Sequence, residues 1–452
     1  MTRYGMTRRA ALRAGVVGAA GAVLPLVNVH GQGSAGVLRC GFWDHWAPAG
    51  NGALAAVCKE WGEKNRVEVS IDLVTSVGNQ NVMTIASEAQ SRSGHDILAF
   101  PPWEPSSHAK LLEPVDDVMA RLQQKYGPVT PAAEYLAKRE GAWRAVPAVA
   151  GTQTKPPCVR YDLLREHAGI DIRAMWPARP EQGPGADAWN WDTFLKAAEK
   201  CHAAGYAFGL PMGQFPDAVD WLGSLFRSFG ASMMDEEGRV TVRGNAKVRQ
   251  ALDYCVRLSQ FLPRDVWAWD DASNNRALIA GKTALILNPP SAWVVARRDS
   301  PAVAEKCWYA PMPAGPEGRF TPYNPAFWGI WSFGKNKSAA KALLEHLSDR
   351  ASAERQATAT SGFDLPPFQS MSNFKIWEVE GPPAGFEFNY PDKPHHQAQL
   401  HVAFAPAPAE AAVQAYVQAV NAKMIARVAQ GGQTLDQAMA WAEGELKNYA
   451  RG

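Results

Sequence analysis

The sequence predicts an α/β protein whose chain forms two lobes, and three observations lead to this prediction. The chain has 452 residues, well beyond the length of a typical single domain. In its first third, apolar strand-like runs alternate with segments of helical spacing, which indicates βαβ units and a largely parallel sheet. A proline-bounded extended segment, Pro147 to Pro157, then precedes a helix-rich region and is a candidate crossing between lobes.

The first third contains three predicted strands and two predicted helices. Apolar runs predict strands at Val37 to Trp43, Val67 to Val74 and His95 to Phe100. Helical spacing predicts helices at Ala53 to Lys64 and Asn81 to Arg92. In the first of these helices, the apolar face consists of Leu54, Val57, Cys58 and Trp61.

The rest of the chain alternates less regularly. Helices are expected at Trp191 to Ala203, Val219 to Phe229, Ala246 to Phe261, Ala409 to Ala429 and Leu435 to Tyr449. Strands are expected at Tyr206 to Leu210, Ala284 to Asn288 and Phe327 to Phe333. A further helix follows Asn336 with Ser338 as its predicted N-cap, and Gly362 to Pro367 is a second candidate crossing.

The composition excludes several classes of protein. Hydrophobic residues make up 46% and charged residues 20%, an ordinary globular balance rather than a disordered or fibrous one. A formal charge of +2 gives no reason to expect a nucleic-acid or anionic-membrane partner. The 17 Trp residues are a surplus that suggests aromatic surfaces with a role besides filling the core.

The N-terminus has the features of an export signal. Thr7 to Arg13 is basic with the arginine pair Arg8 and Arg9, and an apolar Gly/Ala-rich run follows from Ala14 to Val29. This resembles a twin-arginine signal, whereas a membrane-spanning helix would need a longer run without Pro25. Residues 1–36 are therefore predicted to be a signal, and the mature protein to be periplasmic. Arg39 before Cys40 is wrong for a lipoprotein cleavage site, so a soluble product is predicted over a lipid-anchored one.

No metal or cofactor is expected. The six cysteines are widely spread, with no Cys-x-x-Cys and no His at zinc-ligand spacing. His395 and His396 are adjacent but lack a third ligand nearby. The cysteines are interpreted mostly as buried thiols, although a periplasmic protein is free to form disulfides.

Several stretches, in order, carry a family resemblance. They are His95 to Leu98 leading into Pro102 and Trp103, Leu111 to Asp117, Ala145 to Pro147, Leu278 to Leu285 leading to Trp293, Gly329 to Ser332 running into Lys335 to Lys341, and Gly431 to Ala438. Together they resemble the extracellular solute-binding proteins of bacterial ABC importers, specifically the large carbohydrate-binding family that includes the maltose-binding protein. Asp162 after Tyr161 and the extra Pro290 after Asn288 depart from the family pattern, so the ligand of no single member is carried over.

The resemblance implies a two-lobed periplasmic binding protein fold with a ligand cleft between lobes joined by two or three hinge crossings. Lobe one would comprise residues 37–150 and 331–364, and lobe two residues 151–330 and 365–452. The implied function is that of a monomeric solute-binding component of an ABC importer. It would capture a sugar or sugar-like polyol by hinge closure and deliver it to the membrane permease.

Ligands of open α/β sheets bind beyond the carboxyl ends of strands, which selects candidate contacts. A sugar presents C–H groups that pack on aromatic rings and hydroxyls that pair with acids, amides and His. The candidates are Asp44, His45, Trp46, Asn79, Gln80, Trp103, Glu104, Gln153, Gln214, Asp217, Trp221, Asn288, Trp293, Phe327 and Trp328. The stretch Trp267 to Asp271 is an aromatic and acidic loop that either rims the cleft or is solvated.

Enzymatic motifs are absent from the sequence. Gly281-Lys282-Thr283 has Arg276 where a phosphate-binding loop needs Gly, and there is no G-x-S-x-G, H-E-x-x-H or G-x-G-x-x-G. The chain is therefore predicted not to be an enzyme. An exported glycosidase-like enzyme stays open as an alternative, since two carboxylates suffice for that chemistry. A binding protein for a quaternary ammonium or a glycerophosphodiester is the other alternative.

Overall fold

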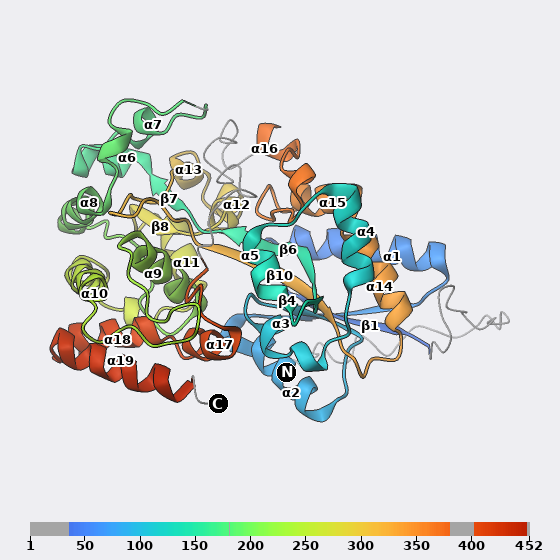
Figure 1. The fold of residues 1–452 in the computed structure, drawn as a ribbon. Coiled ribbons are helices and arrows are strands. Elements are labelled where there is room, and N and C mark those ends of the chain that lie inside the picture. The colour runs from blue at the N-terminus through green and yellow to red at the C-terminus, as the bar shows by residue number, and fades with distance from the viewer. Residues whose placement is uncertain (1–35, 180, 380–401, 450–452) are drawn as a thin grey trace, which may run out of the picture.

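The computed structural model describes residues 36–179, 181–379 and 402–449, and the chain folds into two α/β lobes, each built on its own sheet (Figure 1). The α/β prediction and the two-lobed fold are therefore confirmed. The expected signal at residues 1–36, apart from residue 36, and the pair His395 and His396 lie outside the described residues.

The first lobe contains a five-stranded sheet in the order β2-β1-β3-β10-β6. Its strands are β1 (Leu38–Trp43), β2 (Val69–Val74), β3 (Ile97–Phe100), β6 (Val146–Thr154) and β10 (Tyr323–Ile330). β2, β1 and β3 are mutually parallel, as the βαβ pattern predicts, whereas β10 runs antiparallel to both β3 and β6. A strand from late in the chain thus completes the sheet begun by the N-terminal residues.

Helices from both ends of this region surround the sheet (Figure 1). They are α1 (Ala49–Asn65), α2 (Gln80–Ser91), α3 (Glu104–Ser107), α4 (Asp116–Tyr126), α5 (Pro131–Ala137), α14 (Lys337–Leu347), α15 (Arg350–Ala359) and α16 (Ile376–Val379), with the short hairpin β4 (Lys138–Arg139) and β5 (Ala142–Trp143). The predicted apolar face of α1 is buried at Leu54, Val57, Cys58 and Trp61. Helix α14 begins after Asn336, so the predicted N-cap Ser338 is wrong and lies inside the helix.

The second lobe contains the three-stranded sheet β8-β7-β9, formed by β7 (Pro157–Arg160), β8 (Leu285–Leu287) and β9 (Cys307–Tyr309). All its pairings are antiparallel, unlike those among β2, β1 and β3 in the first lobe. The predicted strand Tyr206 to Leu210 is wrong, because these residues form no strand. The segment reaches the sheet through two backbone bonds, Gly209 N–H to Leu285 O at 2.8 Å and Ala284 N–H to Tyr206 O at 3.3 Å.

Two helices of this lobe have the predicted bounds, Trp191–Ala203 and Leu435–Tyr449. The helices of the lobe are α6 (Tyr161–Leu163), α7 (Ile172–Met175), α8 (Trp191–Ala203), α9 (Pro216–Ser228), α10 (Ala246–Ser259), α11 (Ser273–Ile279), α12 (Ser291–Asp299), α13 (Pro301–Ala304), α17 (Ala409–Val417), α18 (Val420–Ala429) and α19 (Leu435–Tyr449). The Asn190 side chain caps α8 by accepting from Thr193 N–H. The predicted helix Ala409 to Ala429 is two helices, because Ala419 has left-handed backbone with φ of 50°.

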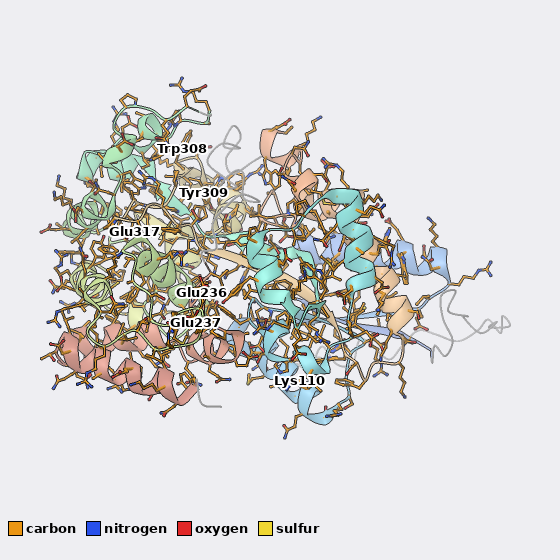
Figure 2. All side chains as sticks on the ribbon, viewed as in Figure 1. Lys110, Glu236, Glu237, Trp308, Tyr309 and Glu317 are labelled. Atoms are coloured by element: carbon orange, nitrogen blue, oxygen red, sulfur yellow. The ribbon has the colours of Figure 1, made fainter. Side chains whose placement is uncertain are left out.

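Side chains fill the space between sheet and helices in both lobes (Figure 2). Tyr309 on β9, labelled in Figure 2, is buried and donates its hydroxyl to the carbonyl of Pro289. The six cysteines are buried free thiols in this structure. Of the helices within the described residues, none is both long and apolar enough to cross a membrane.

Strands β6 and β10 run together between the lobes near the centre of Figure 1. The segment after α15 joins them there, because Gly151 N–H donates to Asp364 Oδ1 at 2.8 Å and Leu365 N–H to Thr152 O at 2.9 Å. The lobe boundaries stay a prediction. Residues just past 364 still contact the first lobe, since Phe368 bridges to Val129 and the Arg350 guanidinium donates to Ser370 O.

Candidate functional site: a cavity between the lobes

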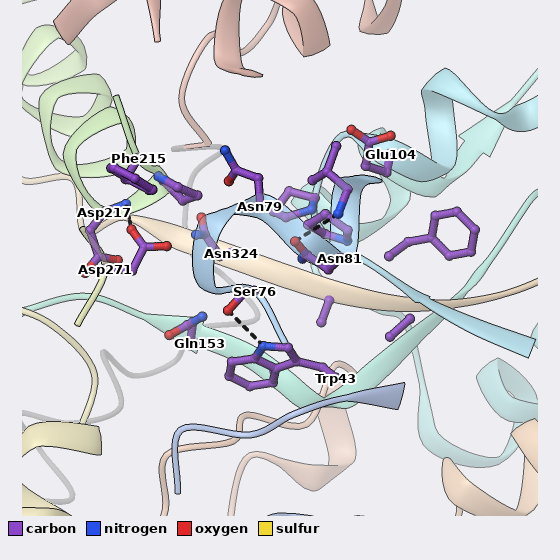
Figure 3. Close-up of a pocket in the computed structure, with 18 of the residues that line it drawn as sticks. Trp43, Ser76, Asn79, Asn81, Glu104, Gln153, Phe215, Asp217, Asp271 and Asn324 are labelled. Atoms are coloured by element: carbon purple, nitrogen blue, oxygen red, sulfur yellow. Dashed lines mark hydrogen bonds between the residues drawn. The ribbon is translucent and has the colours of Figure 1, made fainter. Parts of the chain in front are cut away.

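A cavity lies between the two lobes and takes its walls from both (Figure 3). The first lobe contributes residues at the ends of β1, β2 and β3 and at the start of α3. The second contributes residues around α9, α11 and α12 and on α17. The crossing strands β6 and β10 contribute Gln153 and Asn324, which face each other across their ladder.

Aromatic rings line the first-lobe side, where Trp43, Trp46, Phe100 and Trp103 lie. Trp43 is held by its indole N–H, which donates to Ser76 Oγ at 3.2 Å, and by its contact with the His45 ring at 4.6 Å (Figure 3). Trp103 is only 2% exposed and packs edge-on against Tyr135. These rings give the cavity apolar faces of fixed orientation.

A buried ion network forms the second-lobe wall. Lys155 Nζ donates to Asp217 Oδ1 and to Asp220 Oδ2, each at 2.6 Å. Asp220 also accepts from Asn324 Nδ2 at 2.6 Å and from the Tyr416 hydroxyl at 2.8 Å. Burial alone would lower the pKa of Lys155, but the surrounding carboxylates raise it above its ordinary value, so the lysine stays charged.

Asp271 is the third carboxylate of this wall. Its Oδ1 accepts the backbone N–H of Asp217 at 3.1 Å, in the first turn of α9 (Figure 3). Burial, followed by the neighbouring Asp217 carboxylate, raises the pKa of Asp271 to about 8. A carboxyl in this state exchanges its proton near neutral pH and responds strongly to any charge placed beside it.

Glu104 carries the remaining carboxylate of the cavity lining, on the first-lobe side. It is 5% exposed, and its Oε2 lies 3.2 Å from His108 Nδ1. Burial alone lowers the pKa of His108, but the contact with Glu104 raises it overall. The Glu104 charge therefore has a partner behind the cavity wall.

Amide side chains make up most of the other polar lining. They are Asn79, Asn81, Gln153, Gln214, Asn275, Asn288 and Asn324. An amide offers both a donor and an acceptor, which suits a ligand with several hydroxyls. In the described parts of the chain, no three His, Cys, Asp or Glu side chains group as a metal site.

The structure brings eight of the predicted contacts to this cavity, namely Trp46, Asn79, Trp103, Glu104, Gln153, Gln214, Asp217 and Asn288. Asp271, from the aromatic and acidic loop, lines it as well. Whether any of these residues contacts a ligand stays a prediction.

The other seven predicted contacts lie outside the cavity lining. Near the first strand, exposed Asp44 accepts from Asn51 Nδ2, and buried His45 lies 2.9 Å from Asp364. Gln80 is exposed at the start of α2. The four aromatic ones fill cores: Trp221 donates to Pro211 O, Trp293 is stacked under Arg297, and Phe327 and Trp328 lie inside the five-stranded lobe.

Sequence reasoning missed several lining residues, among them Trp43, Ser76, Asn81, Lys155, Phe215, Asn275, Asn324 and Tyr416. Trp43 is the last residue of β1 and Ser76 lies just after β2, so the strand-end rule includes them when it is applied from the last strand residue onward. Lys155, just before Pro156, is the one basic residue in the predicted crossing Pro147 to Pro157. A single charge in an otherwise uncharged crossing could have marked it as a candidate. Asn324 and Tyr416 give no local signal.

Two α/β lobes with a cavity between them at their crossing strands have the arrangement of a solute-binding protein of the periplasmic binding protein type. Residues 46–354, more than half of the chain, match the family described as bacterial extracellular solute-binding proteins, and the chain belongs to that family. A probable ABC transporter-binding protein of Deinococcus radiodurans is 28% identical over 196 residues, which are 40% of this chain. The match spans 45% of that relative's length.

Solved structures with this fold include three sugar or polyol complexes. Maltose-bound MalE3 of T. maritima has a TM-score of 0.73 at 20% identity and covers 92% of this chain and 100% of its own. A sugar transporter protein of Arthrobacter chlorophenolicus with laminaribiose has 0.71 at 14%, covering 91% and 99%. A solute-binding protein of Agrobacterium radiobacter with ribitol has 0.71 at 13%, covering 91% and 98%. At these identities the likeness establishes the fold.

Proposed function

We propose that this chain is the periplasmic binding component of an ABC importer that captures a sugar or polyol between its lobes and delivers it to the permease. The observation that carries the proposal is the cavity, which faces aromatic rings from one lobe with amides and carboxylates from the other. Rings cover the C–H face of a sugar, and the polar groups pair with its hydroxyls. The maltose, laminaribiose and ribitol complexes of the structural relatives support this class of ligand.

The proposed mechanism is hinge closure about β6, β10 and the segment around Asp364. We assign lobe one to residues 37–150 and 331–364 and lobe two to residues 151–330 and 365–452. A ligand that touches both walls favours the closed arrangement by the contacts it makes only there. The closed form then docks on the permease.

A thermal-shift screen across sugars, polyols, polyamines and betaines tests the function. A true ligand at about 100 times its dissociation constant adds about 2.7 kcal/mol of stability. The Gln153→Ala variant tests the site, because no described residue hydrogen-bonds to the Gln153 side chain and the fold does not depend on it. We expect it to weaken binding about tenfold. The matched control is Gln124→Ala on the exposed face of α4, which should change nothing.

The outcomes separate the alternatives. Stoichiometric binding of a sugar or polyol without product supports transport, whereas turnover of glycosides would support an exported enzyme instead. Binding of betaines alone would replace the sugar by a quaternary ammonium. If no compound of the screen stabilises the protein, the proposed function is wrong.

Export is proposed through a twin-arginine signal in residues 1–36, giving a soluble, monomeric periplasmic protein. Replacing Arg8 and Arg9 by Lys should retain the protein in the cytoplasm of a bacterial host, as measured by fractionation. Equal periplasmic yield of the variant would contradict this route. Light scattering of the purified mature protein measures its oligomeric state.

A further inference from the structure

The hydrogen bonds of the second-lobe wall fix the direction in which its amides point. Asp217 Oδ2 can only accept, so Asn274 donates to it through Nδ2, at 3.0 Å. Asn274 Oδ1 therefore faces Asn288, whose Nδ2 lies 3.4 Å from it and also bonds to Asn275 Oδ1. With its amide nitrogen committed, Asn288 has its Oδ1 left over for the cavity.

Asn288 is therefore an open acceptor, and Asp271 becomes a second one on the same wall when its carboxyl is ionised. Asn288 is 4% exposed and lines the cavity, and no described residue donates to its Oδ1. Asp271 uses Oδ1 for the Asp217 N–H, and no described residue donates to its Oδ2. An acceptor of this kind in a closed site needs a donor from the ligand, because an unmatched buried polar group is costly.

The charges of the lining favour a donor that is also a cation. Among the described residues that line the cavity, Lys155 is the only basic one, and Asp217 and Asp220 share it. Asp271 has no cation within salt-bridge distance among the described residues, whereas Glu104 on the first-lobe side pairs with His108. A neutral hydroxyl can bond to the protonated Asp271 carboxyl, whereas a positive charge beside it also stabilises the ionised carboxylate.

We propose, on the basis of the proposed function, that the ligand bears a protonated primary amine on its hydroxylated skeleton, with Asp271 as counter-ion and Asn288 Oδ1 as second acceptor. The ligand class is then an amino sugar or an amino polyol. A quaternary ammonium lacks the N–H that these acceptors require. The aromatic rings of the first lobe cover the C–H faces of the same skeleton.

Calorimetric titration of matched pairs tests the proposal in the mature protein. The pairs are glucosamine and glucose, galactosamine and galactose, and glucamine and sorbitol. We expect the amine of at least one pair to bind at least about tenfold more tightly than its neutral partner, the size of effect that a charged hydrogen bond produces. Because the pKa of Asp271 is about 8, binding the cation at pH 7 should release close to one proton, measured in buffers of different ionisation enthalpy.

The Asp271→Asn variant isolates the carboxylate, because the Asn oxygen can still accept the Asp217 N–H. It should lose the proton release and weaken amine binding at least about tenfold, while a neutral partner binds within about twofold. The matched control is Asp253→Asn, an exposed position on α10 paired with Arg257, which should change neither.

A neutral sugar that binds as tightly as its amine, or an Asp271→Asn variant with unchanged amine affinity and proton release, would overturn the inference and leave the proposed function standing. If neither member of any pair binds and the wider screen also fails, the proposed function falls and the inference with it. Binding of choline in preference to every primary amine would likewise overturn the inference.

Discussion

At the scale of single residues, Lys155 is the group on which the second-lobe wall depends. Its single positive charge pairs with two buried aspartates, Asp217 and Asp220. Removing the cation would leave both carboxylates in a low-dielectric site with only amide and hydroxyl donors. Such uncompensated charge is far more costly than the loss of an exposed ion pair.

The Lys155→Met variant should therefore lower the free energy of unfolding by about 3 to 5 kcal/mol, measured by urea denaturation. Its matched control is Lys447→Met, which removes the exposed pair with Glu443 on α19 and should cost no more than about 0.5 kcal/mol. Equal costs for the two variants would show that the buried network contributes no more than a surface pair.

Asp271 gives the stability a pH dependence whose sign follows from its raised pKa. Between its unfolded value near 4 and the folded value of about 8, the folded state holds the proton more strongly, so stability falls as the pH rises through this window. The Asp271→Asn variant has no titrating group at this position and should not lose this stability as the pH rises. We expect its melting temperature to exceed that of the wild type at pH 8 and to match it near pH 4, by calorimetry. A constant difference at both pH values would contradict the assignment.

At the scale of elements, β6 is shaped for its role as a crossing by one glycine. Gly151 has φ of +91°, and a Cβ there would lie 3.2 Å from both the Trp43 ring and the Ala326 side chain. Only a glycine allows β6 to pass this close beneath the cavity wall while turning in the left-handed region. Strand β6, which is part of the proposed hinge, therefore packs directly against Trp43 in the cavity wall.

Gly151→Ala should cost more than backbone strain alone. Gly141→Ala is the control, because Gly141 also has positive φ, +79°, but its Cβ would meet nothing within 4 Å. We expect about 1 kcal/mol for the control from backbone strain and a clearly larger loss for Gly151→Ala, in denaturant unfolding. If both variants lose the same free energy of unfolding, the Trp43 ring moves aside for the new Cβ without cost, which would contradict this prediction.

The sequence predicted those helices and strands whose boundaries are marked by neighbouring residues, such as a capping side chain or an apolar run. Helix α8 has the predicted bounds because Asn190 caps it, and the strands β1 and β3 are plain apolar runs. Strand β10 begins four residues before the predicted Phe327, since Asn324 and Pro325 interrupt the apolar pattern there. Those interrupting residues line the cavity.

The candidate site divides in the same way. Residues in the loops that follow strands, such as Trp46 and Asn79, are predicted by the strand-end rule. Lys155 is 62 residues from Asp217, and Asp220 is 196 residues from Tyr416, so these pairings exist only in the folded chain. Neither periodicity nor a motif in a single sequence predicts contacts between residues so far apart, so the ion network could be identified only in the structure.

At the scale of the whole molecule, the cavity belongs to neither lobe alone, and its ligand is expected to change the shape of the protein. In the proposed hinge closure, the first-lobe rings and the second-lobe carboxylates contact one ligand together when the lobes approach. X-ray scattering of the mature protein should therefore show a smaller radius of gyration with saturating ligand. Asp271→Asn at an amine concentration that saturates only the wild type should remain at the larger radius, while Asp253→Asn becomes compact. Tight binding with an unchanged radius of gyration would rule out closure and show that the two lobes bind ligand without moving relative to each other.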